Sequence, residues 1–382
     1  MREDGVWRWL WRWLGWLIPA AVALLLTGVL PLFPDFTERV FSRGISRAVT
    51  TTVGKAVSLV PFSLTEAAIF ALLGGIALAF LVVLFKTIWR ALRHEEQPKS
   101  HPLRLLRVCG WVVSCMVLFH LCAAGANYYR LPAEELCDLP VRRAVPADEL
   151  YAVCVALADG ASTEREALRE DADGCAQLCA DIAQTLDRAG EGYDPLAKTY
   201  PFLQHNVTCV KPVTHLSHKW SQVAGMSGVY FSLLVEPNIN VDVPEIDIPF
   251  AAEHEMAHLR GIAKEDEANF FGALSCFAHP SADYRYSGYL QAYLYCANAL
   301  YEEDHALWEK AQTHCSDGVK RDLKAQNDYW ESFAAGAADI PGGQALRYQS
   351  VEESRGSYAR VVQLLCAYYD GGNRPFDGLQ ER

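Results

Sequence analysis

Charged residues are scarce in this chain of 382 residues: they make up 21% of it, whereas 51% of the residues are hydrophobic. That balance excludes an intrinsically disordered chain, which would be poor in apolar residues. The sequence also lacks internal repeats, low-complexity segments and the glycine period of collagen, and it is too long for a small scaffold held by disulfides. Its formal net charge of −12 offers no basic face, so no nucleic-acid partner is expected.

The charges that are present divide unevenly along the chain. Residues 1–130 contain 14 Lys and Arg against 7 Asp and Glu, whereas residues 131–382 contain 20 against 39. The first segment is therefore basic and very apolar, and the second is acidic with the composition of an ordinary soluble protein. We predict a membrane domain over residues 1–130 and a soluble domain over residues 131–382.

Three runs in the first domain have no Asp, Glu, Lys or Arg. They cover residues 14–33, 67–85 and 108–126. A helix of about 20 apolar residues crosses the hydrocarbon layer, so these runs predict a three-helix transmembrane anchor with the lipid bilayer as partner. His120 lies in the third run, and we expect a neutral imidazole bonded to a neighbouring helix. The tryptophans before the first run favour a retained anchor over a cleaved signal peptide: Trp7, Trp9, Trp11, Trp13 and Trp16.

Basic residues predict the orientation of this anchor. The segment between the second and third runs contains Lys86, Arg90, Arg93, Lys99, Arg104 and Arg107 against two glutamates. The positive-inside rule places this segment and the N-terminus in the cytoplasm, and the acidic domain outside. The segment between the first and second runs would then lie outside although it is also basic. Its apolar positions have helical spacing and predict an amphipathic interfacial helix: Phe36, Val40, Phe41 and Ile45.

The acidic domain is predicted to be mainly helical with a small sheet. Segments rich in Ala, Leu and acidic residues predict helices at Leu150–Ala158 and Glu164–Ala189. The run from Val229 to Val235 is β-branched and aromatic, which predicts a strand. The chain is again helical in character from Pro249 onward. Nine cysteines lie in this domain, and an extracytoplasmic location would allow several disulfides with at least one free thiol.

The segment from residue 248 to residue 261 contains the pattern His-Glu-x-x-His. On a helix, His254 and His258 lie one turn apart, so both imidazoles project from one face and can bind a single metal ion. Glu255 beside them is placed to act as general base on a metal-bound water. Gly261 can end the helix in a left-handed cap. A polar helix face with two ordinary histidines is the alternative, and the cap and the acidic segment after it favour the metal site.

A third ligand for one Zn²⁺ is expected just after this helix, in an acidic stretch. Glu265 and Asn269 are four residues apart and share a helix face, so we prefer Glu265 as the ligand. Asn269 would then hydrogen-bond a ligating imidazole. Glu267 is the alternative ligand. If it is not a ligand, it would hydrogen-bond a ligating residue, or its negative charge would simply stabilise the positive N-terminus of the helix.

The spacing of these residues resembles a known pattern. The Glu-x-x-Ala-Asn motif of residues 265–269, after the His-Glu-x-x-His motif of residues 254–258, is similar to that of the gluzincin metallopeptidases, with a shorter separation between the two motifs. In that group the first Glu of the second motif is the third zinc ligand.

Over most of its length the chain also resembles DUF3810, an uncharacterised bacterial membrane family with three N-terminal spans and a His-Glu-x-x-His domain. The resemblance implies a zincin-like, mostly helical α+β metallopeptidase domain and names no substrate. The matching runs are residues 227–231, 236–240, 254–269, 286–290 and 357–362.

Other candidate residues surround the predicted zinc site. In zincin peptidases an edge strand before the zinc helix pairs with extended substrate, and residues 228–240 occupy that sequence position. Gly228, Asn238 and Asn240 are therefore candidate substrate-binding residues, with an ordinary core hairpin as the alternative. A hydrolase also needs a donor for the oxyanion, for which Tyr358 is the first candidate and Arg360 the second. A tyrosine packed in the core is the alternative for Tyr358.

Together these patterns predict a membrane-anchored, zinc-dependent metallohydrolase, a peptidase acting on peptide or protein substrates. The predicted location is the bacterial cytoplasmic membrane, crossed several times. The alternative is a non-catalytic zinc-binding sensor or scaffold domain of the bacterial envelope. The intact Glu255 favours the enzyme, because a scaffold has no need of a general base there.

Overall fold

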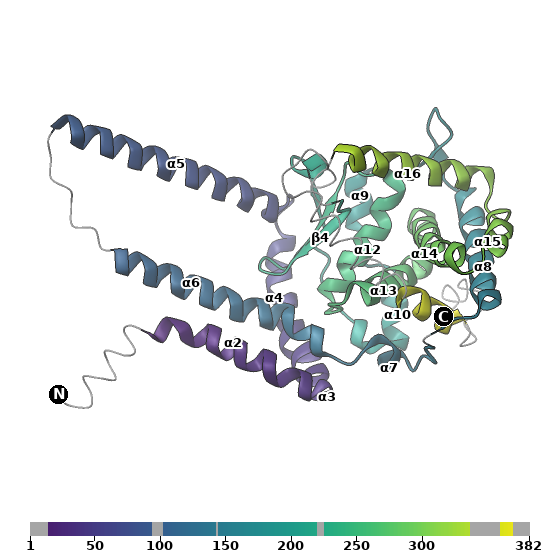
Figure 1. Cartoon of the computed structure of the whole chain (residues 1–382), viewed down its shortest axis with the longest axis horizontal. Helices are drawn as coiled ribbons and strands as arrows, with labels where there is room; N and C mark the ends of the chain where they lie inside the picture. Colours follow the sequence, from purple (N-terminus) through teal and green to yellow (C-terminus); the bar gives the residue numbers. More distant parts are fainter. Residues whose placement is uncertain (1–13, 94–101, 143, 220–224, 337–359, 370–382) are drawn as a thin grey trace.

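The computed structural model describes residues 14–93, 102–142, 144–219, 225–336 and 360–369 (Figure 1). It is mainly helical and contains two small sheets. Three long helices project from one side of a body formed by the later part of the chain (Figure 1). These helices correspond to the three apolar runs of the sequence.

The three apolar runs all form helices, as predicted. The first run forms α2 (Ile18–Val29), flanked by one-turn helices η1 (Gly15–Leu17) and η2 (Leu30–Leu32); the others form α5 (Leu64–Arg93) and α6 (Pro102–Ala123). The stretches Gly15–Leu32, Leu64–Arg90 and Leu106–Ala123 are long and apolar enough to cross a membrane. Helix α5 extends beyond its predicted run at both ends. Helix α6 ends before the predicted boundary and is followed by the short helix η4 (Gly125–Tyr129).

Helices α2 and α6 pack against each other, whereas α5 stands apart. The backbone N–H of Ala20 donates to Ser114 Oγ at 2.8 Å. Gly110 lies so close to Trp16 that a Cβ there would come within 2.6 Å of the indole, a small-residue contact of the kind that brings membrane helices together. In the apolar stretch of α5 the buried share is 0%, against 17% in the other two. Along this stretch the side chains of α5 are thus not covered by other described residues.

A helical segment crosses the base of the three long helices (Figure 1). It consists of α3 (Pro34–Phe36), the wide-turned helix η3 (Thr37–Ser46) and α4 (Arg47–Ser58). The amphipathic helix predicted here is confirmed as a helix. One of its apolar positions, Phe41, is buried, and the other three, Phe36, Val40 and Ile45, are exposed.

A buried ion pair joins this crossing segment to the rest of the chain. The Arg130 guanidinium contacts both carboxylate oxygens of Glu38, at 2.7 and 2.9 Å, and both residues are buried. Burial works against ionisation of Glu38, but Arg130 and Arg43 outweigh it and hold the pKa of the carboxyl below its usual value. Arg130 also donates to the backbone carbonyl of Gly261 at 2.8 Å. One guanidinium therefore connects the helices near the membrane with the loop after residues 254–258.

Removing this guanidinium should destabilise the chain strongly. We expect Arg130→Met to lower the free energy of unfolding by about 3–5 kcal/mol, because Glu38 is left buried and uncompensated. Unfolding of the purified chain in detergent would measure the loss. Arg142→Met is the matched control, since Arg142 pairs with Glu149 at the surface and such pairs contribute at most about 1 kcal/mol. Equal losses in the two variants would contradict the role given to Arg130.

Helices dominate the second part of the chain. They are α7 (Ala133–Cys137), α8 (Ala147–Arg165), α9 (Ile182–Asp187), α10 (Tyr193–Thr199), η5 (Pro201–Leu203), η6 (Glu245–Asp247), α12 (Ile248–Leu259), α13 (Glu265–Ala278), α14 (Ala282–Glu303), α15 (His305–Gln312) and α16 (Asp317–Gly336). Helix α14 lies in the middle of the core and packs against α8, α12 and α13. The core is rich in aromatic side chains and includes buried Tyr284, Tyr286, Phe270, Phe271 and Phe277.

The prediction of one long helix at Glu164–Ala189 is wrong. Helix α8 ends at Arg165, and a two-stranded hairpin of β1 (Arg169–Glu170) and β2 (Ala176–Gln177) follows before α9 begins. The turn has a local cause: Asp171 Oδ1 accepts hydrogen bonds from the backbone N–H groups of Asp173 and Cys175, each at 2.9 Å. Gly174 adopts a φ of +73°, which glycine tolerates without strain.

The larger sheet contains three strands in the order β3-β5-β4. Strand β5 (Glu236–Asn240) is central, parallel to β3 (Lys211–Val213) and antiparallel to β4 (Gly228–Phe231). The strand predicted from Val229 to Val235 therefore ends early, at Phe231. Residues 232–235 form a tight hairpin turn, in which Val235 has a φ of +55°. Strand β4 lies at the edge of this sheet, next to α12.

All twelve cysteines are free thiols, so the disulfides expected in the acidic domain are not formed. Half of the thiols are buried: Cys154, Cys209, Cys276, Cys296, Cys315 and Cys366. A buried free cysteine packs as a small hydrophobic residue, and these contribute to the core in that way.

Candidate metal centre

Helix α12 ends in a glycine turn that also orients His258. Gly261 has a φ of +82°, and its N–H donates to His258 O at 3.0 Å while Ile262 N–H donates to Ala257 O at 3.1 Å. This pair of bonds is a Schellman cap, as the position of Gly261 predicted. The turn brings the Ile262 carbonyl to 2.7 Å from His258 Nδ1. Because a carbonyl only accepts, Nδ1 keeps its proton and Nε2 faces the neighbouring side chains.

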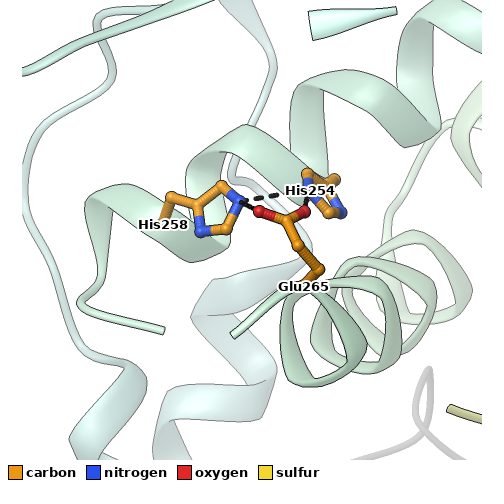
Figure 2. A group of neighbouring side chains, drawn as sticks. All are labelled: His254, His258 and Glu265. Atoms are coloured by element: carbon orange, nitrogen blue, oxygen red, sulfur yellow. Dashed lines mark hydrogen bonds and ion pairs between the residues drawn. The ribbon is translucent and has the colours of Figure 1, made fainter. Parts of the chain in front are cut away.

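The next helix supplies the third side chain of the cluster. Glu265 is the first residue of α13, and its carboxylate lies between His254 and His258, which both point from one face of α12 (Figure 2). The two helices approach closely at Gly272, where a Cβ would lie 3.2 Å from His254 Cα. A glycine at this position allows the short distance across which Glu265 reaches both imidazoles.

The spacing of the three side chains fits a tetrahedral zinc site. His254 Nε2 lies 3.1 Å from His258 Nε2 and 3.1 Å from Glu265 Oε2, and His258 Nε2 lies 3.5 Å from Glu265 Oε1. Two ligand atoms about 2.0–2.1 Å from zinc at the tetrahedral angle are about 3.3–3.4 Å apart. Two imidazoles and one carboxylate are also the ligand types of catalytic zinc sites, which keep the fourth position for water.

The charges within the cluster reinforce one another. Desolvation works against ionisation of Glu265, but its hydrogen bonds to His254 and His258 outweigh this and hold the pKa of the carboxyl far below its usual value. Burial alone would lower the pKa of His258, whereas Glu265 and Glu255 raise it to about 9. A metal ion that binds His258 Nε2 would therefore compete with a proton for this atom.

Glu255 lies beside the cluster with its carboxylate buried. Only 4% of the residue is exposed, and among the described residues its Oε2 has no hydrogen-bond partner. Burial raises the pKa of Glu255, although the charges of His254 and His258 oppose the shift. Gly228 on β4 makes room for the carboxylate, because a Cβ there would come within 2.7 Å of Glu255 Oε1. A buried carboxylate with one unused oxygen suits a group that exchanges a proton.

One cavity of about 910 Å³ joins the cluster to several other elements. His254, His258, Glu255 and Glu265 all line it, together with residues of α6, η4, β4, α14 and α16. Asp247 lines it two helical turns before His254, where Gln326 and Trp330 of α16 donate to its carboxylate. Burial raises the pKa of Asp247 to about 7. The volume is that of a site for a small molecule or a short peptide segment.

The structure separates the two candidate carboxylates of α13. Glu265 joins the histidines, whereas Glu267 is buried behind them, where it accepts from Ala133 N–H at 3.2 Å and pairs with Lys264 at 3.1 Å. Burial raises the pKa of Glu267. Asn269 lines the cavity on the same side as Glu265. The geometry therefore brings Glu265 to the cluster, places Asn269 in the wall of the cavity and leaves Glu267 in a structural position.

The substrate-binding candidates differ in their positions. Gly228 lines the cavity beside Glu255, as the prediction requires. Asn238 does not reach it, because its side chain is buried and bonded to Ser63 Oγ at 2.6 Å and Thr65 Oγ1 at 3.0 Å. Asn240 is also buried, and it donates to Met226 O at 3.0 Å. Both asparagines belong to the central strand β5, so their side chains hold neighbouring segments together.

Of the two candidate oxyanion donors, only Arg360 belongs to the described residues. Arg360 forms ion pairs with Glu134 and, at 3.8 Å, with Asp266, and it does not line the cavity. Tyr358 lies outside the described residues.

Two further side chains at the site are not evident from the motif. The ring of Tyr230 on β4 lies nearly parallel to that of His258, with 24° between the planes and 6.4 Å between the ring centroids. His120 of α6 lines the cavity and bonds Ser232 Oγ at 2.7 Å, so it contacts the β4–β5 hairpin and not the neighbouring helix that we expected. The alternation along β4, which places Tyr230 on the face of Gly228, is the one sequence signal for the first of them.

Fold and site together define a class: a mainly helical protein whose described residues include three helices able to cross a membrane and a His-His-Glu cluster in a cavity of its second part. The chain belongs to the family described as "Protein of unknown function (DUF3810)", whose model matches residues 41–366. No curated protein and no solved structure matches the chain.

Proposed function

We propose that this protein is a membrane-anchored zinc metallohydrolase, a peptidase with a zincin-like domain. The observation that carries the proposal is the cluster of His254, His258 and Glu265, whose ligand atoms have tetrahedral zinc spacing, next to a buried Glu255 in one cavity. Zinc is the metal of choice for two imidazoles and one carboxylate. A non-catalytic zinc scaffold would not require the buried base or the cavity.

A zinc ion bound here would supply a Lewis acid that polarises a carbonyl and lowers the pKa of water towards 7. The protein residues perform the remaining steps. Glu255 would accept a proton from the attacking water at Oε2 and pass it to the leaving amine, for which its raised pKa is suited. The backbone of Tyr230 hydrogen-bonds this carboxylate and keeps it in place.

The edge strand β4 provides a binding surface for an extended substrate. Gly228, Val229 and Tyr230 of this strand line the cavity, and β5 covers only one of the two edges of β4. A peptide added at the other edge would gain main-chain hydrogen bonds beside Glu255. This arrangement of an edge strand next to the zinc helix supports a peptide bond as the scissile group.

The apolar helices support a proposal for the location of the protein. We propose a multi-pass protein of the bacterial cytoplasmic membrane, with α2, α5 and α6 as spans. The basic segment between α5 and α6 would be cytoplasmic by the positive-inside rule, which places the domain with the metal centre outside.

Metal removal tests the proposal. We expect the full chain, purified in detergent, to contain one zinc per molecule and to cleave members of a random peptide library. A chelator should abolish cleavage, and added Zn²⁺ should restore it, because the chemistry needs the ion. Elemental analysis and mass spectrometry of the digest provide the measurements. A chain with one zinc and no cleavage would support the scaffold instead.

A further inference from the structure

The cavity of the metal centre reaches the end of the third apolar helix. It is lined by His120 of α6, by Tyr128 of η4 and by Ala124, which lies between the two helices. The stretch Leu106–Ala123 of this helix is long and apolar enough to cross a membrane, so its end would mark the level at which the chain leaves the apolar layer. One end of the cavity therefore lies at the membrane surface.

Strand β4 runs from the metal centre towards that surface. Its first residue, Gly228, lies against Glu255, and Ser232, just beyond its last residue, bonds His120. Ser232 follows Gly228 by four positions, which corresponds to about 13 Å of extended chain. In the described part of the chain no strand covers the outer edge of β4.

The hairpin between β4 and β5 lies between α5 and α6 where these helices meet the body (Figure 1). On one side Ser232 bonds His120, and on the other the Glu236 carboxylate accepts from Leu64 N–H at 2.9 Å and Thr65 N–H at 2.7 Å. Along its apolar stretch α5 is not covered by other described residues, which would leave lateral access from the bilayer to the hairpin. Phe231 and Tyr128 are 36% and 54% exposed at this level, and such aromatic side chains favour the interface.

We propose that the substrate is a peptide chain anchored in the bilayer on its N-terminal side and cleaved about four residues beyond the surface. The inference rests on the proposed hydrolysis. An incoming strand pairs preferentially in the antiparallel sense, which would continue the β5–β4 arrangement. Because β4 runs from Gly228 towards the membrane, an antiparallel partner runs away from it. The N-terminal side of the substrate is then the side held in the lipid.

Matched peptides in vesicles test this polarity. The full chain is reconstituted in phospholipid vesicles with three random peptide libraries: one carrying an apolar membrane helix at the N-terminus, one carrying it at the C-terminus, and one without an anchor. Both anchored libraries have the same concentration at the membrane. A tether that fits the geometry raises the apparent affinity about 10²- to 10⁴-fold, and one that does not fit adds nothing. We expect the N-anchored library to be cleaved about 100-fold faster than the C-anchored one, within about four to six residues of the anchor.

The outcomes separate this inference from the function on which it rests. Equal rates for the two anchored libraries, faster cleavage of the C-anchored one, or cuts far from the anchor would overturn the polarity and leave the peptidase intact. Preference for the unanchored library would overturn the membrane-bound substrate. If the natural chain cleaved none of the three libraries, and so did not differ from the Glu255→Gln variant, the proposed hydrolysis itself would be overturned.

Discussion

Glu255→Gln is expected to lower the rate of peptide hydrolysis by about 10²- to 10⁴-fold, the usual contribution of a general base. The amide has almost the shape of the carboxylate but cannot accept the proton at Oε2. Zinc should stay bound, because Glu255 lies outside the triangle of His254, His258 and Glu265. Kinetic measurement of kcat with a cleaved library peptide, together with the zinc content, would show the loss of turnover at full metal occupancy.

Glu253→Gln is the matched control on the same helix. Glu253 faces the core, where its carboxylate accepts from Gly190 N–H at 2.7 Å and from Ser275 Oγ at 2.8 Å. Burial raises the pKa of Glu253 to about 7, so a neutral glutamine is close to its protonated form and can keep both bonds. Activity should survive in this variant. Equal losses in the two variants would indicate damage to the helix and count against Glu255 as the base.

The metal motif was predictable because its information is local. His254 and His258 share a helix face through a four-residue spacing, and Gly261 marks the end of the helix through its need for a positive φ. The three apolar helices were predictable for a similar reason, since length and composition alone define them. None of these inferences depends on which segments meet in space.

What the sequence did not reveal depends on contacts between distant segments. The side chain of Asn238 looked like a free polar group on an edge strand, but β5 is central and the residue is buried against Ser63 and Thr65. Arg360 likewise forms an ion pair with Glu134, which lies far from it in the sequence. The incorrect prediction of a helix after α8 has another cause. Asp171 and Gly174 favour a turn strongly enough to override the helical composition around them.

The choice between Glu265 and Glu267 shows how three-dimensional contacts resolve an ambiguity of the sequence. Both acids lie in the first turn of α13, where either would favour the helix N-terminus. Residue 265 faces α12, and two residues further the helix has turned by about 200°. Glu267 therefore points to the other side, towards Ala133 N–H and Lys264.

Paired substitutions at these two positions should separate a ligand from a structural carboxylate. We expect Glu265→Gln to weaken zinc binding by on the order of 100-fold or more, since even the loss of a group behind a ligand costs about 10- to 100-fold. The amide lacks the charge that offsets zinc and holds His254 and His258 in place. Competition with a chromogenic zinc chelator would give the affinity of each variant.

Glu267→Gln should leave the zinc affinity unchanged, because the amide oxygen can still accept from Ala133 N–H and the side chain does not reach the cluster. The raised pKa of Glu267 shows that its burial already disfavours the charged form, so the neutral amide should also be tolerated in folding. If Glu267→Gln lost zinc and Glu265→Gln kept it, the ligand set would have to be reassigned. Both variants differ from the natural chain by the same atom exchange in the same helical turn, so a difference between them reports position alone.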